Sequence, residues 1–201
     1  MIFAAMWPSD PSGPGRYRYL IGGVMTPPYI FMIEVKSMQG MTKREFMITD
    51  EQELRRILDT AKVLRLGLSV DGEPYIYPMN YGYTLENGEL KLYLHSAVNA
   101  HKLELLRKNP SVCFQLDCDN IPFEGKVACQ YGLAYHSISG RAKAVLVEDV
   151  EEKMEAMSVL MKTQTGGDFT FNERLVSIVA VIRLDVTEYT AKHRPIPENL
   201  R

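Results

Sequence analysis

Hydrophobic and polar residues alternate along several short stretches of the chain, which is the pattern of half-buried β-strands. The clearest stretch is 89–95, where Leu90, Leu92 and Leu94 alternate with Lys91, Tyr93 and His95. Similar runs predict strands at 63–70, 74–83, 112–118, 128–135 and 137–147, the last two as separate strands or as one long bent strand. The run 175–186 is almost continuously apolar, so we expect a strand that is covered on both faces.

Two dipeptides mark tight turns between these runs. Asp71-Gly72 separates 63–70 from 74–83, and Asn87-Gly88 precedes 89–95. Both dipeptides tolerate the left-handed backbone that a two-residue hairpin turn needs. The sequence therefore predicts two β-hairpins.

Three segments have the apolar spacing and end signals of helices. Thr49 or Asp50 can cap the first, whose inward face carries Leu54, Ile57, Leu58 and Ala61. A short second helix is expected at 99–108, ended by Asn109-Pro110, and a third begins after Asp149 and stops near Gly166. With about six antiparallel strands and so few helices, we expect a mainly β protein, a small barrel with helices packed outside it.

Residues 1–40 differ from the rest of the chain. They contain five of the 11 prolines and five of the 14 glycines, and no periodic pattern persists beyond a few residues. We expect a poorly ordered extension, or a start codon assigned too far upstream, ahead of one domain at 41–201. The remaining alternative is a genuine arm with one strand at 29–35.

Charge and cysteine usage narrow the range of functions. The chain has 201 residues, 23 Lys and Arg, 25 Asp and Glu, and a net charge of −2. With this balance of charges, the chain has no net positive electrostatic field that would attract nucleic acid or an anionic membrane. No window of the sequence is apolar enough to span a bilayer. The three cysteines are odd in number and form no C-x-x-C, which favours a reducing compartment, the cytoplasm.

The stretch 93–102 carries the strongest chemical signal. It predicts a strand, a short turn and the start of a helix, whose free N–H groups suit a phosphate. Ser96 can add a hydroxyl, and Lys102, with His101 beside it, can add a cation. The alternative is an ordinary turn with a solvated lysine.

Other candidates are less specific. Asn80, within the stretch 77–83, could hydrogen-bond the rim of a heterocycle, although an aromatic strand without a ligand explains the same pattern. The pair Tyr135 and His136 begins another predicted strand, where a lone histidine is more often structural. Common dinucleotide, P-loop, zinc-protease and hydrolase motifs are absent, and we predict no metal site.

Together, these elements resemble a known family. The segments KVLRLGLSVDGEPYIYPMNYGY (62–83), LYLHSAVNAHKLELLRKNPSVCF (92–114) and YHSISGRAKAV (135–145) are similar to the FMN-binding split-barrel proteins related to pyridoxamine 5′-phosphate oxidase. The nitroimidazole-resistance branch is the most similar. The resemblance covers about residues 44–194.

The resemblance implies an antiparallel, Greek-key-like split barrel that forms a homodimer, with FMN in clefts between the subunits. Matched to the family's motifs, the FMN-binding residues are Tyr77, Pro78, Met79, Asn80, Tyr81, His95, Ser96, His101, Lys102, Tyr135 and Ser137. The oxidase has arginine where this chain has His101, and basic residues where it has Tyr77 and Gly82.

The function that this resemblance implies is an FMN-dependent oxidoreductase of a small substrate, nitroaromatic compounds among the candidates. His95 would be its catalytic residue, because an imidazole can donate a proton near neutral pH. Two alternatives remain open: a flavin-binding or storage protein without turnover, and a haem-binding split-barrel protein.

Overall fold

The computed structural model describes residues 46–200, apart from the side chain of Asn199. The chain divides into two units, Met1–Thr42 and Lys43–Arg201, and the fold below is that of the described part of the second unit. The predicted extension at 1–40, with the alternatives of an upstream start and a strand at 29–35, lies outside the described residues.

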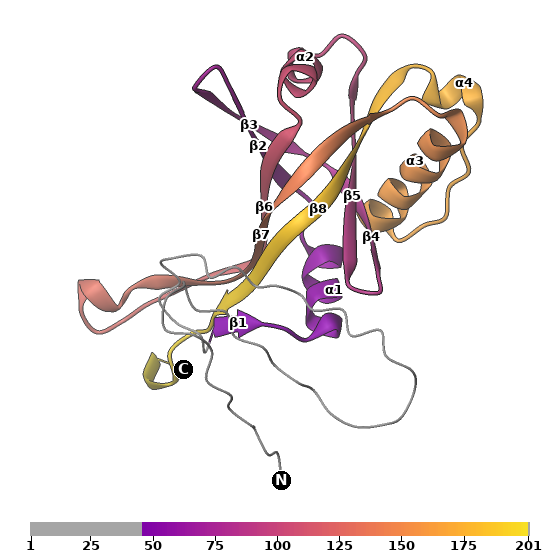
Figure 1. The fold of residues 1–201 in the computed structure, drawn as a ribbon. Coiled ribbons are helices and arrows are strands. Elements are labelled where there is room, and N and C mark those ends of the chain that lie inside the picture. Colours follow the sequence, from indigo (N-terminus) through magenta and orange to yellow (C-terminus); the bar gives the residue numbers. More distant parts are fainter. Residues whose placement is uncertain (1–45, 201) are drawn as a thin grey trace, which may run out of the picture. The chain divides into compact units, whose positions relative to one another are not determined.

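One antiparallel sheet of eight strands forms the body of this unit (Figure 1). Its strand order is β3-β2-β6-β7-β8-β5-β4, and β1 pairs with β8. The strands are β1 (Met47–Ile48), β2 (Leu64–Val70), β3 (Glu73–Met79), β4 (Tyr81–Glu86), β5 (Glu89–Ala97), β6 (Ser111–Phe123), β7 (Gly132–Val147) and β8 (Val179–Arg194). The helices are α1 (Glu51–Thr60), α2 (His101–Lys108), α3 (Val150–Thr165) and α4 (Glu173–Val176), with short 3-10 turns at Ala128–Gln130 and Glu198–Leu200.

Both predicted hairpins are present. Asp71 and Gly72 have φ angles of 54° and 84° between β2 and β3, and Asn87 and Gly88 have 52° and 82° between β4 and β5. Positive φ at both central residues is the geometry of a type I′ turn, whose twist matches that of the flanking strands. The turn chemistry therefore sets the register of both strand pairs.

The prediction of one continuous strand at 74–83 is wrong. The chain breaks at Asn80, because Met79 pairs with Leu64 on β2 whereas Tyr81 pairs with Leu94 on β5. Strands β3 and β4 therefore follow each other in sequence but lie at opposite ends of the sheet order. This break splits the barrel between β3 and β4.

Other predicted strand boundaries also differ from the structure, since β6 extends to Phe123 and does not end at 118. The stretch predicted at 128–135 begins with the 3-10 turn, but the alternative of one long strand is confirmed from Gly132, where β7 begins and runs to Val147. The stretch predicted at 175–186 begins with helix α4, because Asn172 accepts a hydrogen bond from the N–H of Leu175 and caps a helical turn. Strand β8 starts at Val179 instead.

The apolar start of β8 is covered on both faces within the chain, as the sequence predicts. Ile182 and Leu184 are buried in the main core, which the sheet surrounds together with α1 and α2. Val181 is buried in a second cluster with Ala156 and Met157 of α3. The mainly β barrel with flanking helices is therefore confirmed.

Helices α1 and α3 fit the barrel for different reasons. Helix α1 begins at Asp50, whose carboxylate accepts a hydrogen bond from the N–H of Glu53, and it buries Leu54, Ile57 and Leu58 in the main core. Helix α3 lies against β4, where Gly82 leaves room for its backbone: a Cβ at Gly82 would lie 2.4 Å from the Cα of Leu160. No helix in the described part of the chain is long and apolar enough to cross a membrane.

Candidate functional site

Three predicted residues from two separate segments meet where β5 leads into α2. The ammonium of Lys102 donates a hydrogen bond to the hydroxyl of Ser96, with 3.2 Å between Nζ and Oγ. The same ammonium lies 5.1 Å from the ring centroid of Tyr77 on β3. The fold therefore brings the stretch 77–83 to the strand–helix turn at 93–102, although about 20 residues separate them in sequence.

The start of α2 adds free backbone donors to this group of residues. Ala100 occupies the N-cap position and has no side chain that could accept hydrogen bonds from the first turn. The first N–H groups of a helix lack partners within it and carry the positive end of its dipole. A phosphate held by Lys102 and Ser96 would therefore also find N–H donors here.

His101 lies beside Tyr75 rather than beside Ser96. Its ring centroid is 6.0 Å from that of Tyr75, in an edge-on contact. Tyr75 shares one face of β3 with Tyr77, because residues two apart on a strand point the same way. Tyr75 is not among the residues predicted from the sequence, although its spacing from Tyr77 is the signal that could have identified it.

His95 and Ser96 point to opposite faces of the sheet, since successive strand residues alternate. Ser96 is 7% exposed and pairs with Ala180, whereas His95 pairs with Val181 of the second cluster. One phosphate group cannot contact both side chains. The Nδ1 atom of His95 is buried and has no hydrogen-bond partner within residues 46–200, so the imidazole keeps a free polar atom.

The residues around the break between β3 and β4 are partly engaged in the fold itself. The side-chain amide of Asn80 donates hydrogen bonds to the carbonyl of Lys62, at 3.1 Å, and to Oε1 of Gln164, at 3.2 Å. The ring of Tyr81 is buried, and its hydroxyl donates to the carbonyl of Leu58. Met79 is buried in the core, and Pro78, on the opposite face, is exposed.

Tyr135 and Ser137 lie far from Lys102. On β8, Ala180 pairs with Ser96 and Lys192 pairs with Ser137, which places the two groups twelve positions apart along one strand. At about 3.3 Å per residue, the separation along β8 is roughly 40 Å. One FMN molecule cannot span this distance within a single chain.

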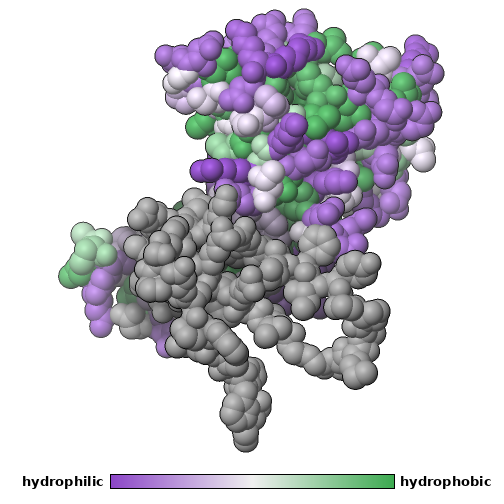
Figure 2. All heavy atoms as spheres, in the orientation of Figure 1, coloured by the Kyte–Doolittle hydropathy of each residue, from purple (hydrophilic) through white to green (hydrophobic). Residues whose placement is uncertain are grey.

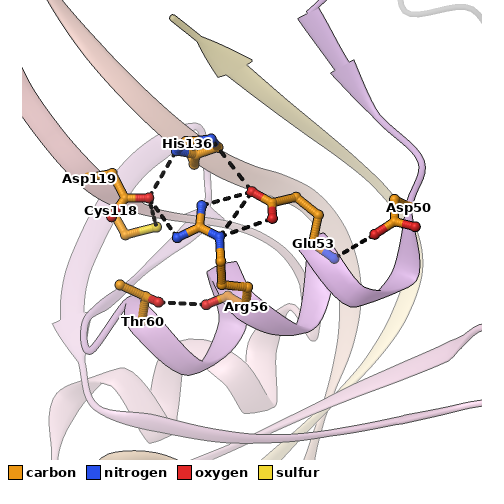
Figure 3. Close-up of polar contacts among 7 residues, drawn as sticks. All are labelled: Asp50, Glu53, Arg56, Thr60, Cys118, Asp119 and His136. Atoms are coloured by element: carbon orange, nitrogen blue, oxygen red, sulfur yellow. Dashed lines mark hydrogen bonds and ion pairs between the residues drawn. The ribbon is translucent and has the colours of Figure 1, made fainter.

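A second polar cluster joins α1 to β6 and β7 (Figure 3). Arg56 binds two carboxylates, with 2.8 Å from Nη2 to Glu53 and 2.8 Å from Nη1 to Asp119. His136 approaches the same two groups, at 3.0 Å from Asp119 and 3.6 Å from Glu53. Asp119 reaches them from an irregularity in β6, where its φ is 55°. These distances make His136 part of the cluster of charged side chains around Arg56. His136 lies within β7 and does not begin a separate strand.

Arg56 holds both carboxylates of this cluster in the charged form. The pKa of Glu53 is lowered, chiefly by the hydrogen bonds that Arg56 donates to it. Partial burial raises the pKa of Asp119, but the hydrogen bonds and charge of Arg56 outweigh that effect and lower it overall. A carboxylate whose pKa is lowered on folding stabilises the fold above its unfolded pKa, and this contribution is lost as pH falls through its folded pKa.

Replacing Arg56 with glutamine should therefore destabilise the fold at pH 7 and much less in acid. The three side chains are 40%, 33% and 31% exposed, so we expect a loss of only about 1 kcal/mol and a melting temperature lowered by roughly 2–4 °C. The difference should shrink below pH 3.8, the ordinary pKa of an aspartate. Thermal melts of both proteins across this pH range test the assignment, and a difference independent of pH would contradict it.

The cysteines form neither a disulfide nor a metal site in the described part of the chain. Cys113, Cys118 and Cys129 are all free. Burial raises the pKa of the Cys118 thiol to about 11, which keeps it protonated at neutral pH. Within residues 46–200, no three His, Cys, Asp or Glu side chains are placed to hold a metal ion.

Several solved structures are similar to this chain. A candidate 5-nitroimidazole antibiotic resistance protein from Bacteroides thetaiotaomicron is 30% identical, with a TM-score of 0.62 over 73% of this chain and 86% of that one. The flavocytochrome Anf3 from Azotobacter vinelandii is 18% identical, with a TM-score of 0.61 over 77% and 73%. An FAD-binding protein from Mesorhizobium loti is 23% identical, with a TM-score of 0.52 over 73% and 96%.

The sequence itself identifies the family. No curated protein matches the chain. The family profile described as pyridoxamine 5′-phosphate oxidase matches residues 50–193, which is most of the chain and nearly all of its described part. The chain belongs to the pyridoxamine 5′-phosphate oxidase family.

Proposed function

We propose that this protein binds FMN and acts as an oxidoreductase of small molecules, with nitroaromatic compounds as the first substrate class to test. The contact of Lys102 with Ser96 and Tyr77 at the start of α2 is the observation that carries the proposal. It supplies a cation, a hydroxyl and an aromatic ring beside free helix N–H groups. The flavin-binding relatives and the candidate nitroimidazole-resistance relative support the same ligand and substrate class.

In this proposal, Lys102, Ser96 and the first turn of α2 bind the FMN phosphate. FMN is favoured over riboflavin because charge-assisted hydrogen bonds to a phosphate are among the strongest that a protein makes. Tyr77 would pack beside the phosphate end of the ligand. The side chains of Met79 and Tyr81 are buried, so any contact of these residues with the ligand would come from their main chain.

A bound flavin would supply the redox chemistry of the reaction. The chain itself needs to orient the ring, exclude water and provide a proton. We assign the proton donor to His95, whose buried Nδ1 is unpartnered within the described residues. Histidine is the side chain that most often serves as a general acid or base, which suits this role.

Turnover distinguishes an enzyme from a binding or storage protein. We expect the FMN-loaded protein to oxidise NADPH or NADH when a 5-nitroimidazole is present, and His95→Gln to lower kcat while FMN affinity stays within about twofold. Tight FMN binding with no turnover on either nicotinamide would support storage, and a Soret band on titration with haem would support haem binding.

We propose further that the functional unit is a homodimer. The roughly 40 Å along β8 between the Lys102 group and the Tyr135–Ser137 group supports it, because a second copy could bring its Tyr135 and Ser137 to the FMN held by the first. The apolar residues at the start of β8 do not support a homodimer, since Val181, Ile182 and Leu184 are buried within their own chain. The hairpin between β6 and β7 exposes Val127 and Tyr131 near its tip, where Figure 2 shows hydrophobic atoms.

The dimer has a direct test in solution. Light scattering at micromolar concentration should give twice the chain mass, and Tyr135→Ala should weaken FMN binding although the residue lies far from Lys102 on the same chain. A stable monomer that binds FMN with unchanged affinity would contradict the shared site.

We place the protein in the cytoplasm, a location that the three free cysteines support.

A further inference from the structure

A cavity lies beside α2, and neither Lys102 nor Ser96 is among its lining residues. Its volume is about 230 Å³, and it opens between α2, the loop that follows β5, and the adjoining ends of β7 and β8. Leu103 and Arg107 line it from α2. The cavity is therefore separate from the site that we assign to the FMN phosphate.

The walls of this cavity are mainly aliphatic. Val147 and Val181 are buried at its base, and Leu146 and Val179 complete the floor. Val98 forms an exposed lip and is 58% accessible. Figure 2 shows hydrophobic atoms in this upper part of the molecule, surrounded by hydrophilic ones. A floor of this kind favours the apolar body of a small organic molecule over a hydrated inorganic ion.

The rim of the cavity carries two cations from different helices. Arg107 comes from the last turn of α2 and Lys153 from the start of α3. Within residues 46–200, neither side chain makes an ion pair or a side-chain hydrogen bond. Glu148 is the one acidic residue on the rim, so the cations exceed the carboxylates by one. The rim therefore attracts an anion.

We propose that this cavity binds a small organic carboxylate, with its apolar body on the valine and leucine floor and its carboxylate between Arg107 and Lys153. The volume lies below the usual range for drug-sized ligands, which limits the occupant to the size of a single ring or a short alkyl chain. Guanidinium and ammonium groups make charge-assisted hydrogen bonds with a carboxylate, whereas they gain much less from a neutral alcohol. The proposal does not depend on flavin binding.

Benzoate is the probe, added to the full-length protein and followed by methyl NMR. We expect saturable shifts at the methyl groups of Val147, Val179 and Val181 at millimolar concentration. Arg107→Gln and Lys153→Gln should each weaken binding by about tenfold, since each removes one charge-assisted contact at a partly exposed rim. Glu148→Gln should strengthen binding by a few-fold, because it removes the one like charge.

The matched control is Lys108→Gln, which removes a neighbouring cation of α2 that lies outside the cavity. This variant should bind benzoate like the parent, and a melting curve for each variant confirms that it folds. The proposal is overturned if the valine methyl groups do not shift, or if Lys108→Gln weakens binding as much as Arg107→Gln. It also fails if benzyl alcohol or inorganic phosphate shifts the same valine methyl groups at as low a concentration as benzoate does.

Discussion

Replacing Lys102 with alanine is expected to weaken FMN binding by roughly ten- to over a hundredfold while leaving riboflavin nearly unchanged. The ammonium bonds Ser96 at 3.2 Å, beside the free N–H groups of α2, so a phosphate placed there would lose its main cationic contact. A hydrogen bond to a charged group contributes about 1.5–3 kcal/mol, and each 1.4 kcal/mol changes affinity tenfold. Riboflavin lacks the phosphate and so does not use this contact.

Fluorescence titrations with both flavins measure this difference. Lys108→Ala is the matched control, because Lys108 is an exposed cation on the same helix. It should leave both affinities unchanged. The assignment of Lys102 is wrong if Lys102→Ala binds FMN like the parent, or if FMN and riboflavin weaken by the same factor.

Among the substitutions proposed here, Gly82→Ala, which adds a single methyl group, should lower the stability of the fold the most. A Cβ there would lie 2.4 Å from the Cα and 2.5 Å from the backbone nitrogen of Leu160, so it could be accommodated only if α3 moved away from β4. Overpacking of this kind costs about 3 kcal/mol, and for a domain of this size we expect Gly82→Ala to lower the melting temperature by roughly 6–12 °C.

Gly167→Ala provides the matched control for this substitution. Its Cβ would lie 3.1 Å from the ring of Phe169, a side chain that is 45% exposed, and 3.4 Å from Oγ1 of Thr165, which is an ordinary contact distance. We expect its melting temperature to stay within about 2 °C of the parent. A Gly82→Ala protein that melts like the parent would show that α3 does not press against β4 as the structure has it.

Much of the fold could be predicted from local signals in the sequence. The Asp-Gly and Asn-Gly dipeptides each have the φ angles that the hairpins need, and the Asp50 and Asp149 caps begin their helices as expected. The break at Asn80 could not be predicted, because the alternation of residues along a strand records burial and not the identity of the neighbouring strand. The residues at 74–79 and 81–83 alternate in the same way although they pair at opposite ends of the sheet.

The candidate site was predictable only in part. Ser96 and Lys102 belong to one strand–helix turn, so their proximity follows from local sequence. Their contact with Tyr77 depends on how β3 and β5 are arranged across the barrel, which no local pattern records. That the side chains of His95 and Ser96 point to opposite faces of the sheet could have been predicted, because successive side chains of a strand alternate between the two faces. The cluster around Arg56 could not have been predicted from the sequence, since it depends on the irregular backbone of β6 at Asp119.

A calorimetric comparison of FMN with riboflavin tests most directly whether this chain binds a flavin through its phosphate. The full-length protein, stripped of any bound flavin, is titrated with FMN and then, in a separate run, with riboflavin. We expect saturable FMN binding with one site per chain, at least tenfold tighter than riboflavin binding. No FMN binding at high micromolar concentration, or equal affinity for the two flavins, would contradict it.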